Sequence, residues 1–204
     1  MKRNFKLGGI LLIITMISGL LLGFANDLTK EAILENSKIS KEDLNYIMPS
    51  AEKIQDSTIE IDSEGAIKKI YEAVNGNELV GYVMKVTSKG FHGAVDFVVG
   101  ISKEDKVTGM KVLSHSETPG LGAKISENKF TERFKDKPAT DYLEIVKVTP
   151  NKDTEVEAIS GATTSSKASV NAVNEAITFY LENVKGETVE QKVETDADTS
   201  ASTN

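Results

Sequence analysis

Residues 159–184 read ISGATTSSKASVNAVNEAITFYLENV and contain the clearest helix of the chain. From position 165 onward its apolar residues recur at steps of three and four, the spacing of an amphipathic helix with one buried face. These residues are Val170, Val173, Ile177, Tyr180, Leu181 and Val184. Gly186 follows at the position where a left-handed residue commonly ends a helix. The pattern therefore predicts a helix over 165–184.

Upstream of this helix, short apolar runs bounded by turn residues predict a series of strands. The alternation is clearest over 80–86, VGYVMKV, and the polar run SKED at 102–105 is typical of a hairpin turn. The predicted strands cover 57–62, 66–74, 79–88, 93–101, 107–113 and 143–148, and a short helix covers 130–134.

The N-terminal part of the chain contains a membrane segment. Residues 7–26 carry no charge, and 20 residues of helix span about 30 Å, the thickness of a bilayer core. Lys2, Arg3 and Lys6 precede the segment and Asp27 follows it. The positive-inside rule then predicts a cytoplasmic N-terminus and a chain that lies outside from about residue 27.

A cleaved signal peptide is the alternative interpretation, because Gly23-Phe24-Ala25 has the small-x-small form of a cleavage site. The long uncharged run favours a permanent anchor, and both interpretations export the rest of the chain. The predicted fold class is α+β, with a single N-terminal transmembrane helix followed by one mixed α/β domain. Its predicted parts are an N-terminus with anchor (1–26), a helical stalk of one or two helices (27–56), a folded domain (57–186) and a disordered acidic tail (187–204).

The composition excludes several classes of protein. With 31 acidic and 24 basic residues the net charge is −7, which argues against nucleic-acid binding, since that needs a basic face. The absence of cysteine rules out disulfides, thiolate metal sites and iron–sulfur clusters. Two histidines make a His-rich metal site a poor expectation.

Directly before the long helix, residues 159–166 read ISGATTSS. Because Ser and Thr are ordinary N-cap residues, a capped helix start is the simplest interpretation, with Thr164, Ser165 and Ser166 as the capping and starting residues. Small neighbours would also let a bulky group reach the hydroxyl of Thr163. A phosphate held there would be stabilised by the free N–H groups and positive end of the helix.

Residues 115–124, HSETPGLGAK, form the second candidate stretch. Pro-Gly at 119–120 predicts a type II turn, and a plain surface turn is the simplest interpretation. Gly120, Gly122 and Ala123 would however let backbone amides approach a flat ligand closely. Glu117, Thr118 and Lys124 would then supply polar contacts at the edge of that ligand.

Both stretches resemble motifs of one known family. Residues 160–163, SGAT, resemble the flavinylation motif of the FMN-binding domain family. HSETPGLGAK closely resembles the companion motif in the G subunit of the Rnf electron-transport complex, and the C subunit of the sodium-pumping NADH:quinone reductase shares much of it. Residues 90–93, GFHG, look like the family's glycine-rich turn, and the resemblance runs from the anchor to about residue 184.

The resemblance implies an FMN-binding domain with FMN joined covalently through its phosphate to Thr163. It implies no catalytic residue and no metal ligand in this chain, but a set of cofactor-binding residues. These are Thr163, Ser160, Gly161, Ala162, Thr164, His115, Glu117, Thr118, Pro119, Gly120, Leu121, Gly122 and Lys124.

The same resemblance implies a membrane-anchored electron carrier that is not an enzyme by itself. Its complex would couple electron transfer between ferredoxin and NAD⁺ to Na⁺ or H⁺ transport. The implied partners are the other membrane subunits of that complex and a flavin transferase that uses FAD and Mg²⁺. Two alternatives stay open: an FMN-carrying subunit of another extracytoplasmic flavin reductase, and an exported ligand-binding or adhesion module without flavin.

Overall fold

The computed structural model describes residues 2–36, 39–62 and 64–187. Nearly all of the predicted acidic tail, from residue 188 onward, therefore lies outside the described residues. The chain divides into two compact units, Met1–Asp43 and Leu44–Asn204.

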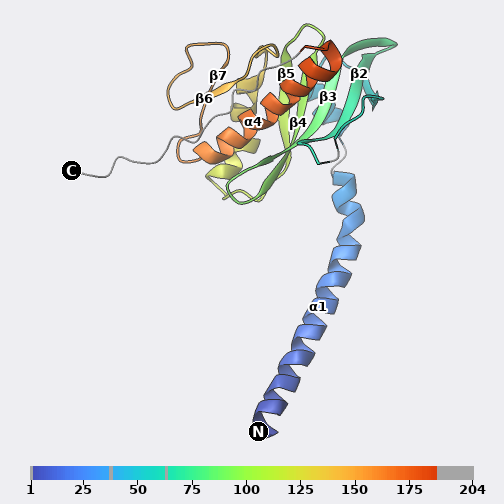
Figure 1. The fold of residues 1–204 in the computed structure, drawn as a ribbon, viewed down its shortest axis with the longest axis vertical. Helices are drawn as coiled ribbons and strands as arrows, with labels where there is room; N and C mark the ends of the chain where they lie inside the picture. Colours follow the sequence, from blue (N-terminus) through green and yellow to red (C-terminus); the bar gives the residue numbers. More distant parts are fainter. Residues whose placement is uncertain (1, 37–38, 63, 188–204) are drawn as a thin grey trace, which may run out of the picture. The chain divides into compact units, whose positions relative to one another are not determined.

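The first unit consists mainly of helix α1 (Lys2–Asn36), drawn in blue in Figure 1. Its segment Gly8–Leu28 has a mean hydropathy of 2.2 and is long and apolar enough to cross a membrane, in agreement with the anchor predicted over 7–26. A second helix, α2 (Lys41–Ile47), follows. The predicted helical stalk is wrong at its end, because Lys53–Asp56 form strand β1, whose backbone pairs with the next strand.

The second unit is built on a five-stranded antiparallel sheet with the strand order β1-β2-β3-β4-β5 (Figure 1). The strands after β1 are β2 (Ile67–Asn75), β3 (Glu78–Lys89), β4 (Ala94–Ser102) and β5 (Val107–Ser114). Each lies within one residue of its predicted end points. The prediction for 57–62 was wrong, since those residues belong to no strand.

One face of the sheet carries the main hydrophobic core. Helix α4 (Thr163–Phe179) and the π-helical turn η3 (Tyr180–Lys185) lie across the sheet on this face (Figure 1). Alternate residues of β4 point towards them and are fully buried: Val95, Phe97, Val99 and Ile101. The helix predicted over 165–184 is confirmed, with a start two residues earlier, and Gly186 ends it in the left-handed conformation (φ +72°).

Glycines let a short segment of chain lie directly on the opposite face. Gly81, Gly100 and Gly109 belong to three neighbouring strands, and Gly100 pairs with Gly109 in register. A Cβ atom on any of them would come within 3 Å of Ile47 or Met48. Because both of those residues are completely buried, the end of α2 is part of the packed domain.

A smaller layer stands beside the N-terminus of α4. It contains two parallel strands, β6 (Glu144–Val146) and β7 (Glu155–Glu157), and the short helices η1 (Gly122–Ser126), α3 (Asn128–Thr131) and η2 (Glu132–Phe134). The predicted strand 143–148 and helix 130–134 correspond to β6 and to α3 with η2. The chain runs from the end of β7 into α4 through residues 158–162.

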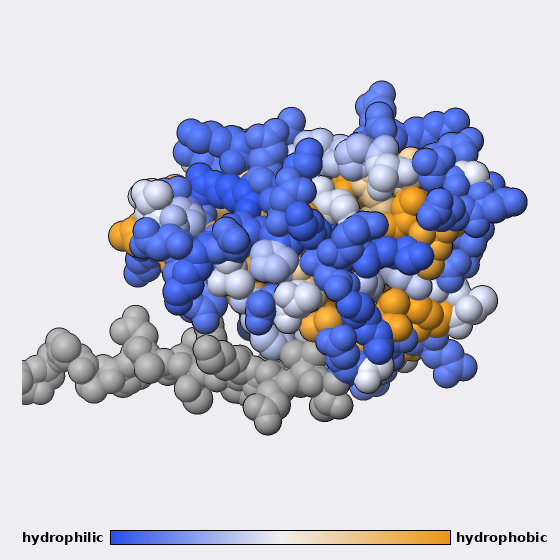
Figure 2. All heavy atoms as spheres, turned by 90° about the horizontal axis from the view of Figure 1, so that it is seen from above, coloured by the Kyte–Doolittle hydropathy of each residue, from blue (hydrophilic) through white to orange (hydrophobic). Residues whose placement is uncertain are grey.

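The surface of the folded domain is largely polar. Figure 2 shows one face that is mainly hydrophilic, with hydrophobic atoms exposed in small separate patches. Among the described residues outside α1, the large hydrophobic side chains that are exposed are those of Phe91, Leu121 and Val148.

Candidate functional site

Thr163 is the first residue of α4, and the turn before it is held by hydrogen bonds from the helix itself. Gly161 adopts φ +77°, a conformation that glycine takes without strain. The Ser166 hydroxyl accepts a hydrogen bond from Ile159 N (3.0 Å) and donates one to Ala162 O (2.9 Å). The turn thus presents Thr163 where the first N–H groups of the helix have no intrahelical partner.

The expected Ser or Thr cap is absent. Ala162 occupies the N-cap position and makes no side-chain capping bond. The prediction that Thr164, Ser165 and Ser166 cap and start the helix was therefore wrong in detail, because the helix has already begun at Thr163. Small residues at 161 and 162 leave this end of the helix open.

The four hydroxyls at the start of α4 differ in their surroundings. Ser165 and Ser166 are buried, and both hydroxyls are committed to hydrogen bonds within the protein. Thr163 is half-buried and Thr164 is exposed. Within the described part of the chain, no hydrogen bond is made by either threonine hydroxyl. Of these four hydroxyls, those of Thr163 and Thr164 are thus the two that are not committed to a hydrogen bond within the described residues.

Glu117 lies inside the protein rather than at the edge of a ligand loop. Its side chain is 5% exposed, and Oε1 accepts hydrogen bonds from the backbone N–H groups of Phe91 (2.8 Å) and His92 (3.0 Å). Its Oε2 accepts a hydrogen bond from the Ser165 hydroxyl at 2.5 Å. The expected role of Glu117 as a direct polar contact for a ligand is therefore not what its surroundings favour.

The histidines support the same loops. The ring nitrogen Nδ1 of His115 accepts a hydrogen bond from the backbone N–H of Glu117 (3.2 Å). Nδ1 of His92 lies 3.4 Å from the Thr118 hydroxyl. Both rings thus stabilise the turn that follows β5.

Two clefts meet at Thr163. The smaller, of about 120 Å³, is lined by Phe91, Glu117, Thr118, Leu121, Gly122, Gly161, Ala162, Thr163, Thr164 and Ser165. Phe91 and Leu121 are 67% and 46% exposed at this cleft. It therefore offers an apolar rim but little depth.

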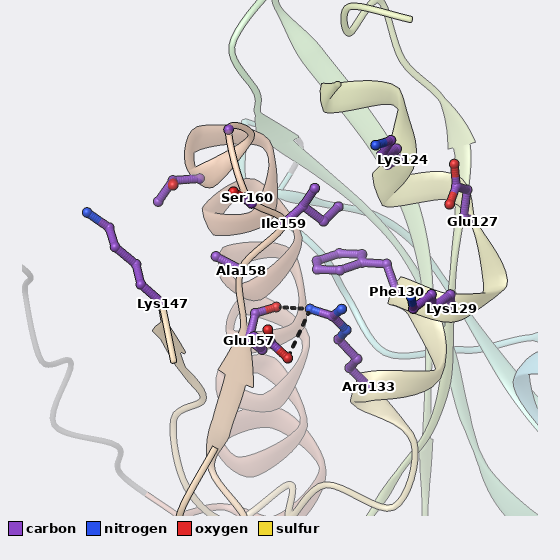
Figure 3. A pocket seen from close by; sticks show the side chains of 12 residues that line it. Lys124, Glu127, Lys129, Phe130, Arg133, Lys147, Glu157, Ala158, Ile159 and Ser160 are labelled. Atoms are coloured by element: carbon purple, nitrogen blue, oxygen red, sulfur yellow. Dashed lines mark hydrogen bonds and ion pairs between the residues drawn. The ribbon is translucent and has the colours of Figure 1, made fainter. Parts of the chain in front are cut away.

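The larger cleft has a volume of about 500 Å³ and lies between α3 with η2 and the segment that leads into α4 (Figure 3). Its lining residues are Lys124, Glu127, Lys129, Phe130, Arg133, Lys147, Glu157, Ala158, Ile159, Ser160, Gly161 and Thr163. The Phe130 ring points across the cleft towards Ile159 (Figure 3). Four basic and two acidic side chains give the cleft an excess of positive charge.

Arg133 connects the two walls of the larger cleft. Its guanidinium donates a hydrogen bond to the backbone oxygen of Glu157 and lies 4.0 Å from the carboxylate of the same residue (Figure 3). It also lies 5.5 Å from the centre of the Phe130 ring. Similarly, Lys137 Nζ donates to Glu155 O (2.9 Å). These two bonds fix β7 and hence the segment that carries Thr163.

The predicted site residues are mostly brought together. The larger cleft includes Ser160, Gly161, Thr163 and Lys124, and the smaller includes Glu117, Thr118, Leu121, Gly122, Ala162 and Thr164. His115, Pro119 and Gly120 line neither cleft. Sequence reasoning missed Lys129, Phe130, Arg133 and Lys147, because they come from separate segments with no motif of their own.

Comparisons with known proteins agree with this architecture. Residues 90–178 match the FMN-binding domain family. The chain is 33% identical over 193 residues to the G subunit of the Na⁺-translocating ferredoxin:NAD⁺ oxidoreductase complex of Acetobacterium woodii, covering 88% of this chain and 92% of that protein. It is 33% identical over 174 residues to the G subunit of the ion-translocating oxidoreductase complex of Methanosarcina acetivorans, covering 83% and 90%.

Two further matches are shorter or more distant. The G subunit of the proton-translocating ferredoxin:NAD⁺ oxidoreductase complex from Clostridium ljungdahlii is 42% identical over 110 residues, which span 54% of this chain and 58% of that protein. The crystal structure of NqrC from Shewanella oneidensis superposes with a TM-score of 0.51 at 19% identity, covering 74% of this chain and 79% of that one. The second match shows that the fold is shared.

Proposed function

This chain belongs to the family of G subunits of ion-translocating ferredoxin:NAD⁺ oxidoreductase complexes, and from that membership we propose that it is a membrane-anchored electron carrier with FMN attached covalently to Thr163. One observation carries the proposal: the Thr163 hydroxyl, free of hydrogen bonds within the described chain, stands at the helix N-terminus where both clefts meet. Thr164 shares only the smaller cleft. This difference favours Thr163 as the attached residue.

The surroundings of Thr163 fit a phosphoester. The first N–H groups of α4 face an anion placed at this end, and the helix dipole adds to their effect. Neither Gly161 nor Ala162 carries a long side chain that would occupy the space beside the Thr163 hydroxyl. Lys124 and Lys147 line the adjoining cleft and add positive charge.

The larger cleft fits the ring of FMN better than the smaller one. Its volume of about 500 Å³ lies within the range usual for cofactor pockets, roughly 300–1,000 Å³, whereas about 120 Å³ does not. The half-buried Ile159 side chain offers apolar contact to a flat aromatic ring, and the Phe130 ring, which is 2% exposed, forms part of the buried cleft wall. The bound flavin would supply reversible electron transfer, and the protein's contribution is to fix the ring's place, exposure and charge environment.

The proposed partners follow from the relatives, whose names describe Na⁺- and proton-translocating ferredoxin:NAD⁺ oxidoreductase complexes. We infer that this chain works with the other membrane subunits of such a complex and exchanges electrons with them. A separate flavin transferase that uses FAD and Mg²⁺ would attach the cofactor. The Thr163 oxygen would displace AMP from the FMN phosphorus of FAD, so that the pyrophosphate bond breaks, the phosphoester forms and the hydroxyl proton is released. With Lys2, Arg3 and Lys6 before the apolar helix, the folded domain would lie outside the cytoplasm.

The test is in-gel flavin fluorescence of the denatured full chain after co-expression with a flavin transferase, since only covalent flavin survives denaturation. Thr163→Val keeps the branched shape and removes the oxygen, so it should abolish the fluorescent band. Thr164→Val is the matched control and should keep it. An FMN mass shift on a peptide of the Thr163→Val protein would refute this assignment.

A further inference from the structure

Three segments that are distant in the sequence meet at the carboxylate of Glu117. Oε1 accepts hydrogen bonds from Phe91 N and His92 N in the turn between β3 and β4. Oε2 accepts the hydroxyl hydrogen bond of Ser165 in the first turn of α4, 48 residues away. Glu117 itself stands in the loop that follows β5. One side chain thus joins two loops and a helix start.

Glycines enclose the same carboxylate. A Cβ atom on Gly122 would lie 2.6 Å from Glu117 Oε2 and 2.6 Å from Ser165 Oγ. A Cβ atom on Gly90 would collide with Glu117 Oε1. The backbone at Gly90 and Gly122 therefore approaches the carboxylate from two sides, and both carboxylate oxygens accept hydrogen bonds from donors within the protein.

The charge of Glu117 is stabilised where it lies. Burial by itself would raise the pKa of the carboxyl, but hydrogen bonds from Ser165, His92 and Phe91 outweigh burial and hold the pKa below its usual range. A carboxylate bonded to the first turn of α4 also interacts favourably with the positive end of that helix. At neutral pH Glu117 is thus ionised, and its carboxylate accepts hydrogen bonds from Phe91 N, His92 N and Ser165 Oγ.

We propose that Glu117 is a positioning residue. Its buried carboxylate fixes the relative positions of the two loops and the start of α4, and flavin attachment at Thr163 depends on this arrangement rather than on contact between Glu117 and the flavin. This inference rests on the proposed function. Ser165, the residue that Glu117 holds, is two positions after Thr163 in the helix. Group transfer to a hydroxyl is sensitive to position, and a displacement of about 1 Å can cost about 10²-fold in rate.

The experiment measures the rate of flavin attachment to the full-length chain by purified transferase, FAD and Mg²⁺. Glu117→Ala removes all three hydrogen bonds and should slow attachment at least about tenfold. Glu117→Gln keeps an acceptor for Phe91 and His92, while its amide can donate to the Ser165 oxygen. This conservative variant should restore attachment to within a few-fold of the native rate. Glu132→Ala, an exposed carboxylate outside both clefts, is the control and should change nothing.

A second readout does not need flavin. Hydrogen exchange of the flavin-free chain should show faster exchange at the Phe91 and His92 amides in Glu117→Ala than in Glu117→Gln, because only the alanine removes their acceptor. Ser165→Ala breaks a single bond and should slow attachment less than Glu117→Ala. If Glu117→Ala does not fold, Glu117→Gln and Ser165→Ala still decide the point.

Equal attachment rates in native and Ser165→Ala chains, or a Glu117→Gln chain as slow as Glu117→Ala, would overturn the positioning role. Unchanged exchange at Phe91 and His92 in Glu117→Ala would overturn it as well. Failure of the proposed function looks different, because the native chain itself would then accept no flavin. The exchange measurement would still show whether Glu117 holds the Phe91 and His92 amides.

Discussion

Gly109 of β5 lies directly against the backbone of Ile47: a Cβ atom on Gly109 would come within 2.9 Å of both the Cα and the carbonyl oxygen of Ile47. The contact joins backbone to backbone, so neither side can move aside as a flexible side chain would. It fixes the end of α2 on the sheet. The short segment that enters the domain is therefore held by the strands themselves.

We predict that Gly109→Ala lowers the free energy of unfolding by about 1–3 kcal/mol, the usual cost of overpacking a buried site. Chemical denaturation of the flavin-free chain measures it. The neighbouring Thr108→Val is the control, because the Thr108 hydroxyl is buried without a hydrogen-bond partner among the described residues. Removing that hydroxyl should leave stability unchanged or increase it. A Gly109→Ala chain as stable as the native one would show that the segment is loosely packed.

Two glycines of one loop should respond differently to substitution. Gly122→Ala places a methyl group against Glu117 and Ser165, so it should disrupt their hydrogen bond and slow flavin attachment. Gly120→Ala meets no atom within 4 Å but must hold φ +75°, so it should cost about 1 kcal/mol in stability without slowing attachment. Attachment rates and thermal unfolding of both variants test this. Equal effects on attachment would show that the loop acts only as a turn.

The predictable part of the fold was the part with strong periodicity. The apolar anchor, the strands β2 to β5 and helix α4 have patterns long enough to outweigh local exceptions. The strands β1 and β7 have four and three residues and are defined by pairing with neighbours, which no local pattern shows. Their positions depend on tertiary contacts, such as the bonds from Arg133 and Lys137 to the backbone of β7.

The candidate site was predictable only where motifs are local. The stretches around Thr163 and Gly120 were found because small residues and turn signals stand together in the chain. The larger cleft was missed, because its walls come from residues near 124–133, 147 and 157–163. Glu117 was placed at the edge of a ligand, since a sequence shows that a carboxylate is present but not which donors surround it.

Acid should destabilise the domain in a defined range of pH. The hydrogen bond from Lys185 (2.5 Å), with that from Tyr180 (2.8 Å), holds the pKa of Asp105 below its ordinary 3.8. A lowered carboxyl pKa stabilises the fold above the unfolded-state value, and this contribution is lost as pH falls through the folded-state value. The pKa of Glu117 is also lowered, so its stabilising contribution is likewise lost as pH falls below about 4.5.

Asp105→Asn isolates this effect, because Asn tolerates the positive φ of 59° at this position and can still accept the Tyr180 hydrogen bond. Near neutral pH the loss should be about 1 kcal/mol or less, since the ion pair with Lys185 is partly exposed. Below pH 3.8 the native and variant stabilities should converge. Denaturation at a series of pH values measures both, and parallel curves throughout would contradict the assignment.

Topology gives a prediction that is independent of the cofactor. The three basic residues before the apolar helix predict that the folded domain is outside the cytoplasm. Protease added to intact spheroplasts should therefore remove the domain and leave an anchor fragment. Digestion only after lysis would show that the domain lies in the cytoplasm and that the predicted orientation is wrong. Moving the basic residues to follow Asp27 should invert the result.

The position of the flavin ring can be tested through charge. Lys147 follows strand β6 and lines the larger cleft with Lys124, whereas Lys152 is 71% exposed and lines neither cleft. A nearby positive charge favours the electron-rich, reduced flavin, so Lys147→Met should lower the midpoint potential of the attached flavin. Lys152→Met has the same change in net charge and should leave the potential unchanged.

The difference between the two variants should shrink at high salt, because Lys147 is exposed and its field is screened. If Leu121→Ala alters the flavin spectrum while Lys147→Met leaves the potential unchanged, the ring lies at the smaller cleft and the basic side chains of the larger cleft act on something else.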